Sequence, residues 1–245
     1  MSLDAWYAGH LKAGEGILRF YGWRPHCISI GYHQDISVID RKKTQKAGID
    51  VVRRPTGGRA IFHAEELTYS IVIARSVTGH RQLYDFVHQV LGRALRSLGY
   101  QVTLSVDGAP LPPLRHVATD FICFTRSARS EIQFNGRKVV GSAQKILPDS
   151  ILQHGSVIIG PAHTGLSRFL QTTPEEKALI DAELQEKTIT LSEIRPEAVT
   201  PERVMAAVVH QLESIENLSI YWQDVTAAEM KQVQECQEDS NYILA

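Results

Sequence analysis

A pair of glycines flanked by arginines is the first feature of the sequence that could do chemistry. The segment 53–63 reads Arg-Arg-Pro-Thr-Gly-Gly-Arg-Ala-Ile-Phe-His and follows a short apolar run. Paired glycines let the backbone approach a ligand closely, and arginines can bind phosphate or carboxylate through two parallel hydrogen bonds. The segment is neither a Walker A loop nor a dinucleotide-binding fingerprint. A tight turn with solvated arginines explains the same residues equally well, because one Gly-Gly pair is a weak signal.

A second segment, 135–144, combines a turn signal with a lysine. Asn135 and Gly136 tolerate the positive φ of a type I′ turn and predict a β-hairpin. Arg137 and Lys138 then point to opposite faces of a regular strand, so one of them tends to face inward. An inward lysine can stabilise negative charge that develops on a carbonyl oxygen, and the small residues at 141–143 leave room for a ligand. A solvent-exposed lysine is the simpler alternative for any single lysine.

The third segment, 152–156, reads Leu-Gln-His-Gly-Ser. His154, next to Gly155 on an expected strand, could act as a base. Taken alone, a buried histidine with satisfied hydrogen bonds is the simpler interpretation.

The elements that must position these residues are mostly strands in the first two-thirds of the chain and helices in the last third. Strands are expected at 17–23, 27–32, 51–54, 67–74, 102–106 and 152–159. Apolar residues recur at three- and four-residue spacing from 79 to 98, which predicts a helix with Thr78 as N-cap. Thr200-Pro201 and the capping box from Thr226 to Glu229 predict two later helices. This order predicts an α+β fold, with a catalytic domain at 1–190 and a small helical extension at 191–245.

Composition limits the function classes. The chain has 245 residues, 43% of them hydrophobic and 22% charged, as in ordinary globular proteins. The formal net charge of −1 argues against a nucleic-acid-binding protein. No apolar run approaches the roughly 20 residues that cross a bilayer, and no signal peptide is recognisable. The three cysteines, Cys27, Cys123 and Cys236, have neither disulfide-framework nor zinc-site spacing. We therefore expect a cytoplasmic protein without a metal.

The three segments, in this order, resemble the lipoate–biotin protein ligase superfamily. The resemblance covers most of residues 1–160 and is carried by segments 18–23, 30–32, 53–63, 66–70, 136–144 and 152–156. It implies a catalytic domain like that of class II synthetases and biotin–lipoate ligases, with mixed, largely antiparallel sheets and packing helices. The substrate-binding residues that it implies are Arg53, Arg54, Gly57, Gly58, Arg59, His63, Gly141, Ser142, Ala143, His154 and Gly155.

Within the superfamily, the sequence is most similar to octanoyltransferases that use a cysteine intermediate. Their Cys-Phe pair upstream of the Gly-Arg-Lys turn is matched here by Cys123-Phe124, fifteen residues before Lys138. The Asn-Asp pair that lipoate–protein ligases show before the hairpin is absent from 121–134, as is the Gly-Arg-Gly-Arg run of biotin ligases. One departure is the sequence Thr-Arg-Ser-Ala at 125–128, where relatives often carry an Asp and a Pro. Cys27 is expected to be a core thiol, and Cys236 incidental.

The resemblance implies a two-step acyl transfer. Cys123 would take an octanoyl group from octanoyl-acyl carrier protein as a thioester, and a lysine of a lipoyl domain would then accept it. The glycine cleavage H protein is one such acceptor. Lys138 would hold the acyl carbonyl oxygen, while His63 and His154 would border the site without direct catalysis. No cofactor would be required, because the donor itself carries phosphopantetheine.

Three alternatives remain open on the sequence. A lipoate–protein ligase would use ATP and form an acyl-adenylate, which the arginine-flanked glycines suit equally well. An amidotransferase that moves octanoyl between lipoyl domains would also use a cysteine. A non-enzymatic acyl-binding sensor on the same fold would leave the spacing of Cys123 and Lys138 without a purpose.

Overall fold

A four-stranded antiparallel sheet is the centre of the protein. The computed structural model describes residues 1–12, 14–105, 131–197 and 199–238, and Cys123 lies outside these ranges. The sheet order is β1 (Gly16–Tyr21), β5 (Glu66–Ala74), β10 (Ser150–Ile158) and β9 (Val140–Ile146). All residues of β10 are buried, and β5 is buried at nearly every position. Side chains on both faces of these two central strands are therefore covered by other parts of the protein.

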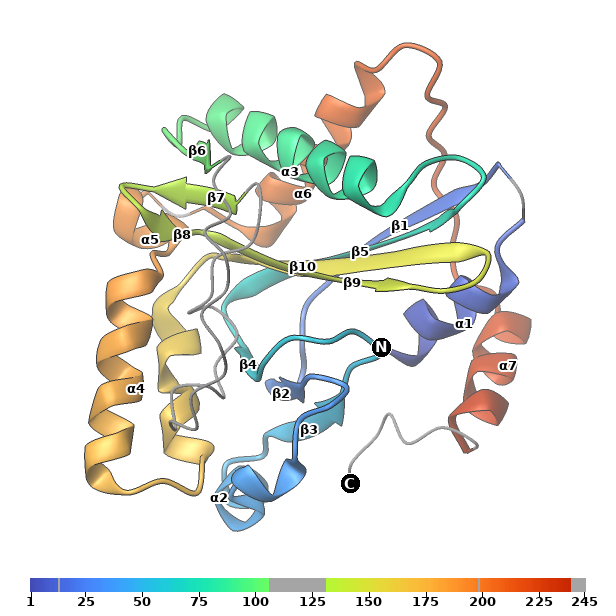
Figure 1. Ribbon diagram of the computed structural model, residues 1–245. Helices are drawn as coiled ribbons and strands as arrows, with labels where there is room; N and C mark the ends of the chain where they lie inside the picture. Colours follow the sequence, from blue (N-terminus) through green and yellow to red (C-terminus); the bar gives the residue numbers. More distant parts are fainter. Residues whose placement is uncertain (13, 106–130, 198, 239–245) are drawn as a thin grey trace.

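A second sheet lies beside the first and carries the glycine segment (Figure 1). Its order is β3 (Asp50–Arg53), β2 (Cys27–Ile30) and β4 (Ile61–His63). Strands β2 and β3 are parallel and are connected through η1 (Ile36–Val38) and α2 (Arg41–Lys46), whereas β2 and β4 are antiparallel. The strands expected at 17–23 and 27–32 both exist, but they belong to different sheets. Cys27 is buried and free, so its assignment as a core thiol is confirmed.

A short third sheet contains the predicted hairpin. It consists of β6 (Thr103–Ser105), β7 (Glu131–Phe134) and β8 (Arg137–Lys138). Asn135 has φ 49° and Gly136 has φ 78°, so both turn residues are left-handed, as the type I′ prediction requires. The turn therefore sets the register that places Lys138 opposite Gln133.

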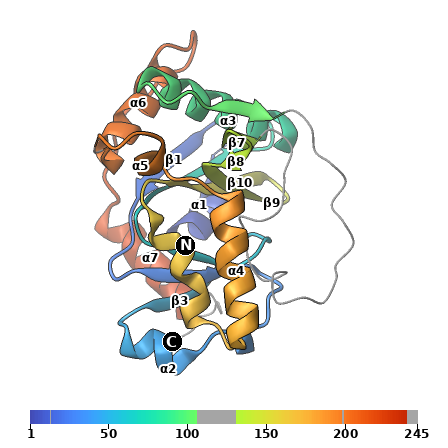
Figure 2. The same ribbon diagram turned by 90° about the vertical axis from the view of Figure 1, so that its left-hand side faces the viewer.

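Helices cover both faces of the main sheet. Figures 1 and 2 show α3 (His80–Ser97) and α6 (Pro201–Glu213) on one face. On the other face, α1 (Ser2–His10) packs on β5 and β10, and α7 (Ala227–Glu238) packs on α1. The helix predicted at 79–98 is confirmed, but Gly79 is its N-cap and Thr78 is not. Both later helix starts are confirmed: Thr200 caps α6, and Thr226 bonds reciprocally with Glu229.

The helices after β10 are joined closely to the hairpin and to the main core. The 3₁₀ helix η4 (Pro161–Phe169) leads into α4 (Pro174–Lys187) and α5 (Leu191–Ile194). Leu191, Val204, Val208 and Leu212 belong to the same apolar cluster as β5 and α3. The domain boundary at residue 190 stays a prediction, although these side chains beyond it share the core of the catalytic sheet. Among the described residues, no helix combines the length and apolar character needed to cross a membrane.

Candidate active site

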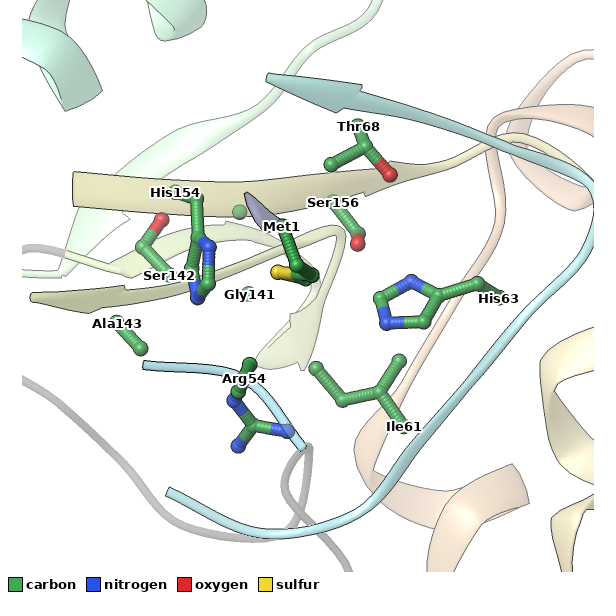
Figure 3. A pocket seen from close by; sticks show the side chains of 11 residues that line it. Met1, Arg54, Ile61, His63, Thr68, Gly141, Ser142, Ala143, His154 and Ser156 are labelled. Atoms are coloured by element: carbon green, nitrogen blue, oxygen red, sulfur yellow. The ribbon is translucent and has the colours of Figure 1, made fainter. Parts of the chain in front are cut away.

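A pocket lies between the main sheet and the glycine segment, as Figure 3 shows. It has about 310 Å³ of empty space, open solvent at its mouth included. Its lining residues come from the N-terminus, β4, β5, β9, β10 and the segment after β3; they are Met1, Arg54, Ile61, His63, Thr68, Gly141, Ser142, Ala143, His154, Gly155 and Ser156. The structure therefore brings together residues from all three segments that the sequence singled out.

His63 is the centre of a buried hydrogen-bond network on one side of the pocket. Its Nε2 lies 2.7 Å from Ser29 Oγ, and its Nδ1 lies 2.7 Å from Glu66 Oε1. Glu66 also accepts hydrogen bonds from the hydroxyls of Thr68 (2.6 Å) and Ser156 (2.8 Å). Burial would raise the pKa of Glu66, but the His63 ring and the two hydroxyls outweigh it and lower that pKa. His63 thus lines the pocket and is fixed between two protein groups.

His154 projects into the pocket from β10. Its Nε2 lies 2.6 Å from Thr56 Oγ1, while its Nδ1 is buried with no hydrogen-bond partner in the described part of the chain. Burial, with the nearby charge of Arg54, lowers the pKa of His154 to about 3. The imidazole is therefore neutral at physiological pH, which fits its expected role at the border of the site. The prediction of a satisfied buried histidine holds for one ring nitrogen only.

Arg54 is buried and fully engaged by the protein. Its guanidinium donates five hydrogen bonds: to Ser29 O and Oγ (3.1 and 3.2 Å), twice to Gly57 O (3.2 and 3.0 Å), and to Arg59 O (2.6 Å). A guanidinium has five N–H groups. The role of Arg54 in substrate binding stays a prediction. Arg54 clamps the glycine segment to β2 and also lines the pocket.

The rest of the arginine–glycine segment also builds structure. Arg53 Nη1 donates to the carbonyl oxygens of Gly31, Tyr32 and Gln34, at 3.1, 2.8 and 2.7 Å. Gly58 has φ 91°, which favours glycine. A Cβ on Gly31 would lie 1.9 Å from Gly58 O, so both glycines are needed where the two loops meet. Arg53, Gly57, Gly58 and Arg59 do not line the pocket among the described residues.

Ser142 lines the pocket, and its hydroxyl is engaged by two other side chains. The Oγ lies 2.6 Å from Tyr69 Oη and 2.7 Å from Nε2 of His88, which belongs to α3. Ser142 pairs with Gly155, and Gly155 pairs with Tyr69, so these positions share the α3 face of the sheet. A Cβ on Gly155 would lie 2.9 Å from Ser142 Oγ. The small residues thus make room for this contact, and not only for a ligand.

Lys138 faces inward, as the resemblance required. Its side chain is 8% exposed, and its Nζ lies 2.7 Å from Oε1 of Glu131, which is 3% exposed. Lys138 does not line the described pocket. It lies in the hairpin that follows residues 106–130, the range that contains Cys123. The simpler interpretation, a solvent-exposed lysine, is wrong.

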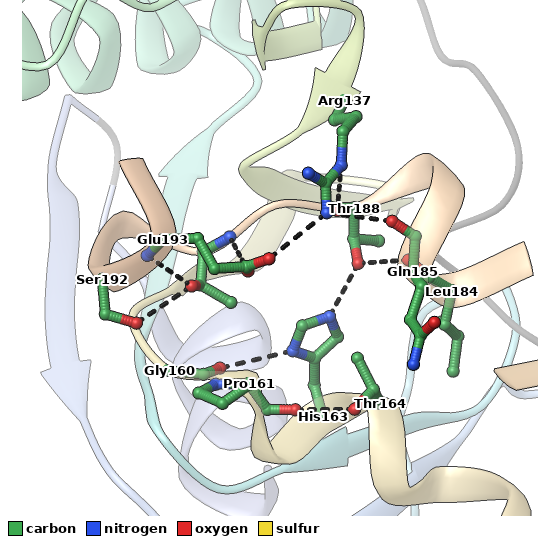
Figure 4. A network of polar contacts seen from close by, with 11 residues as sticks. Arg137, Gly160, Pro161, His163, Thr164, Leu184, Gln185, Thr188, Ser192 and Glu193 are labelled. Carbon is green, nitrogen blue, oxygen red and sulfur yellow. Dashed lines mark hydrogen bonds and ion pairs between the residues drawn. The ribbon is translucent and has the colours of Figure 1, made fainter. Parts of the chain in front are cut away.

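The end of α4 and the segment after it hold the hairpin that carries Lys138, and Figure 4 shows the contacts of the neighbouring Arg137. Ile189 N donates to Lys138 O at 3.0 Å. Arg137, on the opposite face, donates to the carbonyl oxygens of Thr188 (2.8 Å) and Gln185 (2.9 Å). Thr188 Oγ1 lies 2.8 Å from His163 Nε2, and burial lowers the pKa of His163. The end of α4 therefore anchors the hairpin that carries Lys138.

Two buried carboxylates, Glu66 and Glu131, contact predicted site residues but were not found from the sequence. Glu66 lies inside a segment that carries the resemblance, and Glu131 begins the predicted hairpin, yet neither was assigned a role. A carboxylate within a strongly apolar strand such as β5 is a usable signal, because a buried charge needs partners. The partner itself, His63 or Lys138, becomes visible only in three dimensions.

Comparisons with known proteins identify the family of the chain. The family model "Lipoyl protein ligase A/B catalytic domain" matches residues 1–213. The octanoyltransferase LipM of Symbiobacterium thermophilum is 39% identical over 72% of this chain and 66% of its own length. That of Geobacillus kaustophilus is 31% identical over 89% and 81%, and that of Staphylococcus aureus 29% over 97% and 90%.

Solved structures share the fold at low sequence identity. A bipartite lipoate protein ligase of Thermoplasma acidophilum superposes with a TM-score of 0.76 at 19% identity, over 98% of this chain and 87% of its own. Lipoate-protein ligase A bound with ATP gives 0.74 at 18%, over 98% and 89%. The comparisons confirm the predicted α+β fold and the octanoyltransferase class. The chain therefore belongs to the lipoyl protein ligase A/B catalytic domain family.

Proposed function

We propose that this chain moves an octanoyl group from octanoyl-acyl carrier protein to a lysine of a lipoyl domain, through a thioester on Cys123. The observation that carries the proposal is the inward-facing Lys138 in a chain whose curated relatives are octanoyltransferases. Cys123 precedes this lysine by fifteen residues in the sequence. The glycine cleavage H protein is an example of an acceptor of the octanoyl group.

The first step forms the acyl-enzyme. The Cys123 thiolate attacks the thioester carbonyl, the bond to the phosphopantetheine sulfur breaks, and that sulfur leaves as a thiolate that takes up a proton. One thioester replaces another, so the step is nearly balanced in free energy. Sulfur suits this role because a thiolate is a strong nucleophile. The buried ammonium of Lys138 would stabilise the oxyanion of the tetrahedral intermediate.

The second step forms an amide. The neutral amine of the acceptor lysine attacks the Cys123 thioester, loses a proton, and expels the cysteine thiolate. Lys138 would again hold the carbonyl oxygen. No cofactor enters either step, because the thioester donor is already activated. A reducing cytoplasm, expected from the three cysteines, keeps the thiol free.

Intact-mass spectrometry after incubation with octanoyl-acyl carrier protein, without ATP, tests the proposal. We expect a mass gain of one octanoyl group that is absent in Cys123→Ala. If Cys123→Ala still transferred octanoyl to a lipoyl domain at a substantial rate, the covalent mechanism would be wrong.

Two further donors separate the alternatives. Transfer of free octanoate or lipoate only when ATP is present would identify a lipoate–protein ligase. Acylation by octanoyl-H protein, with none by octanoyl-acyl carrier protein, would identify an amidotransferase. Uptake from neither thioester would favour an acyl-binding sensor.

A further inference from the structure

We propose that Glu131 is the positioning residue for Lys138 and holds its ammonium group in the orientation that the acyl carbonyl requires. The inference rests on the proposed function, because it concerns how Lys138 performs its part. Glu131 Oε1 and Lys138 Nζ are 2.7 Å apart, and their side chains are 3% and 8% exposed. At such burial, a contact of this length fixes both side chains.

The hairpin register brings the two side chains together. Lys138 on β8 pairs with Gln133 on β7, and Glu131 lies two residues from Gln133 on the same strand. Alternate residues of a strand share a face, so Glu131 and Lys138 are diagonal neighbours on one face of the hairpin. The second carboxylate oxygen, Oε2, accepts a hydrogen bond from Gln133 Nε2 at 3.1 Å. Glu131 is therefore itself held in place.

The charges explain why a carboxylate is found here. Moving an ammonium group out of water costs several kcal/mol of free energy unless an opposite charge compensates for the lost hydration. Glu131 supplies that charge to Lys138. The pair thus keeps a buried cation in the hairpin, whereas neutral acceptors surround Arg54, which donates four bonds to carbonyl oxygens and one to the Ser29 hydroxyl.

Backbone and side chain of Lys138 are constrained by different parts of the chain. Ile189 and the Arg137 contacts hold the hairpin backbone against the end of α4. Glu131 contacts the ammonium group of the side chain. Loss of Glu131 should therefore leave substrate binding largely intact and slow the chemical step, because the ammonium loses its direction while the hairpin stays in place.

The test measures kcat and KM for octanoyl transfer from octanoyl-acyl carrier protein to a lipoyl domain in Glu131→Gln, which keeps the shape and removes the charge. We expect kcat to fall about 10- to 100-fold with little change in KM. Glu131→Asp should recover part of kcat, which also covers the case in which Glu131→Gln fails to fold. The matched control is Glu197→Gln, which removes the exposed carboxylate 2.8 Å from Arg195 and should have no effect.

A double variant separates positioning from a general structural effect. In the Lys138→Met background, Glu131→Gln should cause no further loss of kcat, because Glu131 acts only through Lys138. An unchanged kcat in Glu131→Gln, or a further loss in the Lys138→Met background, would overturn the inference while the proposed function stands. Absence of an octanoyl-enzyme in the unaltered protein would instead overturn the proposed function, and this inference with it.

Discussion

Arg54 and Lys138 are both buried cations near the site, but different groups surround them. Arg54 donates to carbonyl oxygens and one hydroxyl of its own loop and of β2. Lys138 instead contacts a carboxylate across a hairpin. The first arrangement uses the cation as a clamp, since its whole set of donors is occupied. The second pairs the cation with an opposite charge in a buried environment.

The comparison separates two ways in which a motif residue can matter. Arginines next to glycines suggest anion binding, yet here they define the path of the backbone. The lysine after a tight turn looks unremarkable in the sequence, yet the structure buries it. Arg54 is thus expected to matter for stability, and Lys138 for the reaction.

The largest effect is expected for Lys138→Met. Removal of a group that stabilises the oxyanion should lower the rate of octanoyl transfer about 10²- to 10³-fold. Glu131 would then be a buried carboxylate without its partner, which should also cost about 3 kcal/mol of unfolding free energy. Combining Lys138→Met with Glu131→Leu should restore stability in urea titrations without restoring activity. Near-normal transfer by Lys138→Met would end the assignment of Lys138 to catalysis.

Arg54→Lys should show the opposite pattern. A lysine cannot reproduce the planar set of five donors that joins Ser29, Gly57 and Arg59. We expect a loss of about 3 kcal/mol in the free energy of unfolding, measured by urea titration. Activity per folded molecule should change only a few-fold at low temperature. Unaltered stability with a large loss of activity would mean that Arg54 contacts the substrate after all.

An intermediate effect is expected for the pH dependence of stability. Because the pKa of His154 is about 3 in the folded protein and about 6.5 when unfolded, the unfolded chain binds the proton first as pH falls. The stability contribution is complete above pH 6.5 and should fall by about 2 kcal/mol by pH 5. His163 adds a contribution of the same sign. His154→Gln should therefore flatten the dependence of the urea midpoint on pH, and an equal slope in both proteins would contradict the burial argument.

The smallest effect concerns the glycine pair. Gly58→Ala should cost about 1 kcal/mol of unfolding free energy, because φ 91° is unfavourable for a residue with a Cβ. Gly57→Ala is the matched control: its φ is not in the left-handed region, and nothing lies within 4 Å of its Cβ position. Thermal denaturation of the two variants should differ accordingly. Equal losses would show that the space at the loop matters more than its backbone angle.

The features that were correctly predicted from the sequence are local ones. The Asn135-Gly136 turn, the amphipathic periodicity of α3 and the start of α6 at Thr200-Pro201 depend on residues within a few positions of one another. Steric limits on φ and the 3.6-residue helical repeat act at that range. The family motifs are local as well, which is why they identified the family and located the candidate residues of the pocket.

Relations between distant segments were not accessible in this way. The strands at the N-terminus look like consecutive partners, yet β1 pairs with β5 and β2 with β3 and β4. The N-cap of α3 shifted by one residue, a choice that depends on how the preceding loop is packed.

The sequence by itself therefore determined the family, the α+β class and the set of residues that could form the site. Only the tertiary structure decided which partner each of them contacts. The hydroxyl of Ser142 lies next to His88, Arg54 donates hydrogen bonds mainly to backbone carbonyl oxygens, and Lys138 forms an ion pair with Glu131. The physical reason is that the direction and the hydrogen-bond partners of a buried side chain are set by neighbours from other strands and helices. Residue type determines which hydrogen bonds a side chain can donate or accept, and packing determines which partner it bonds to.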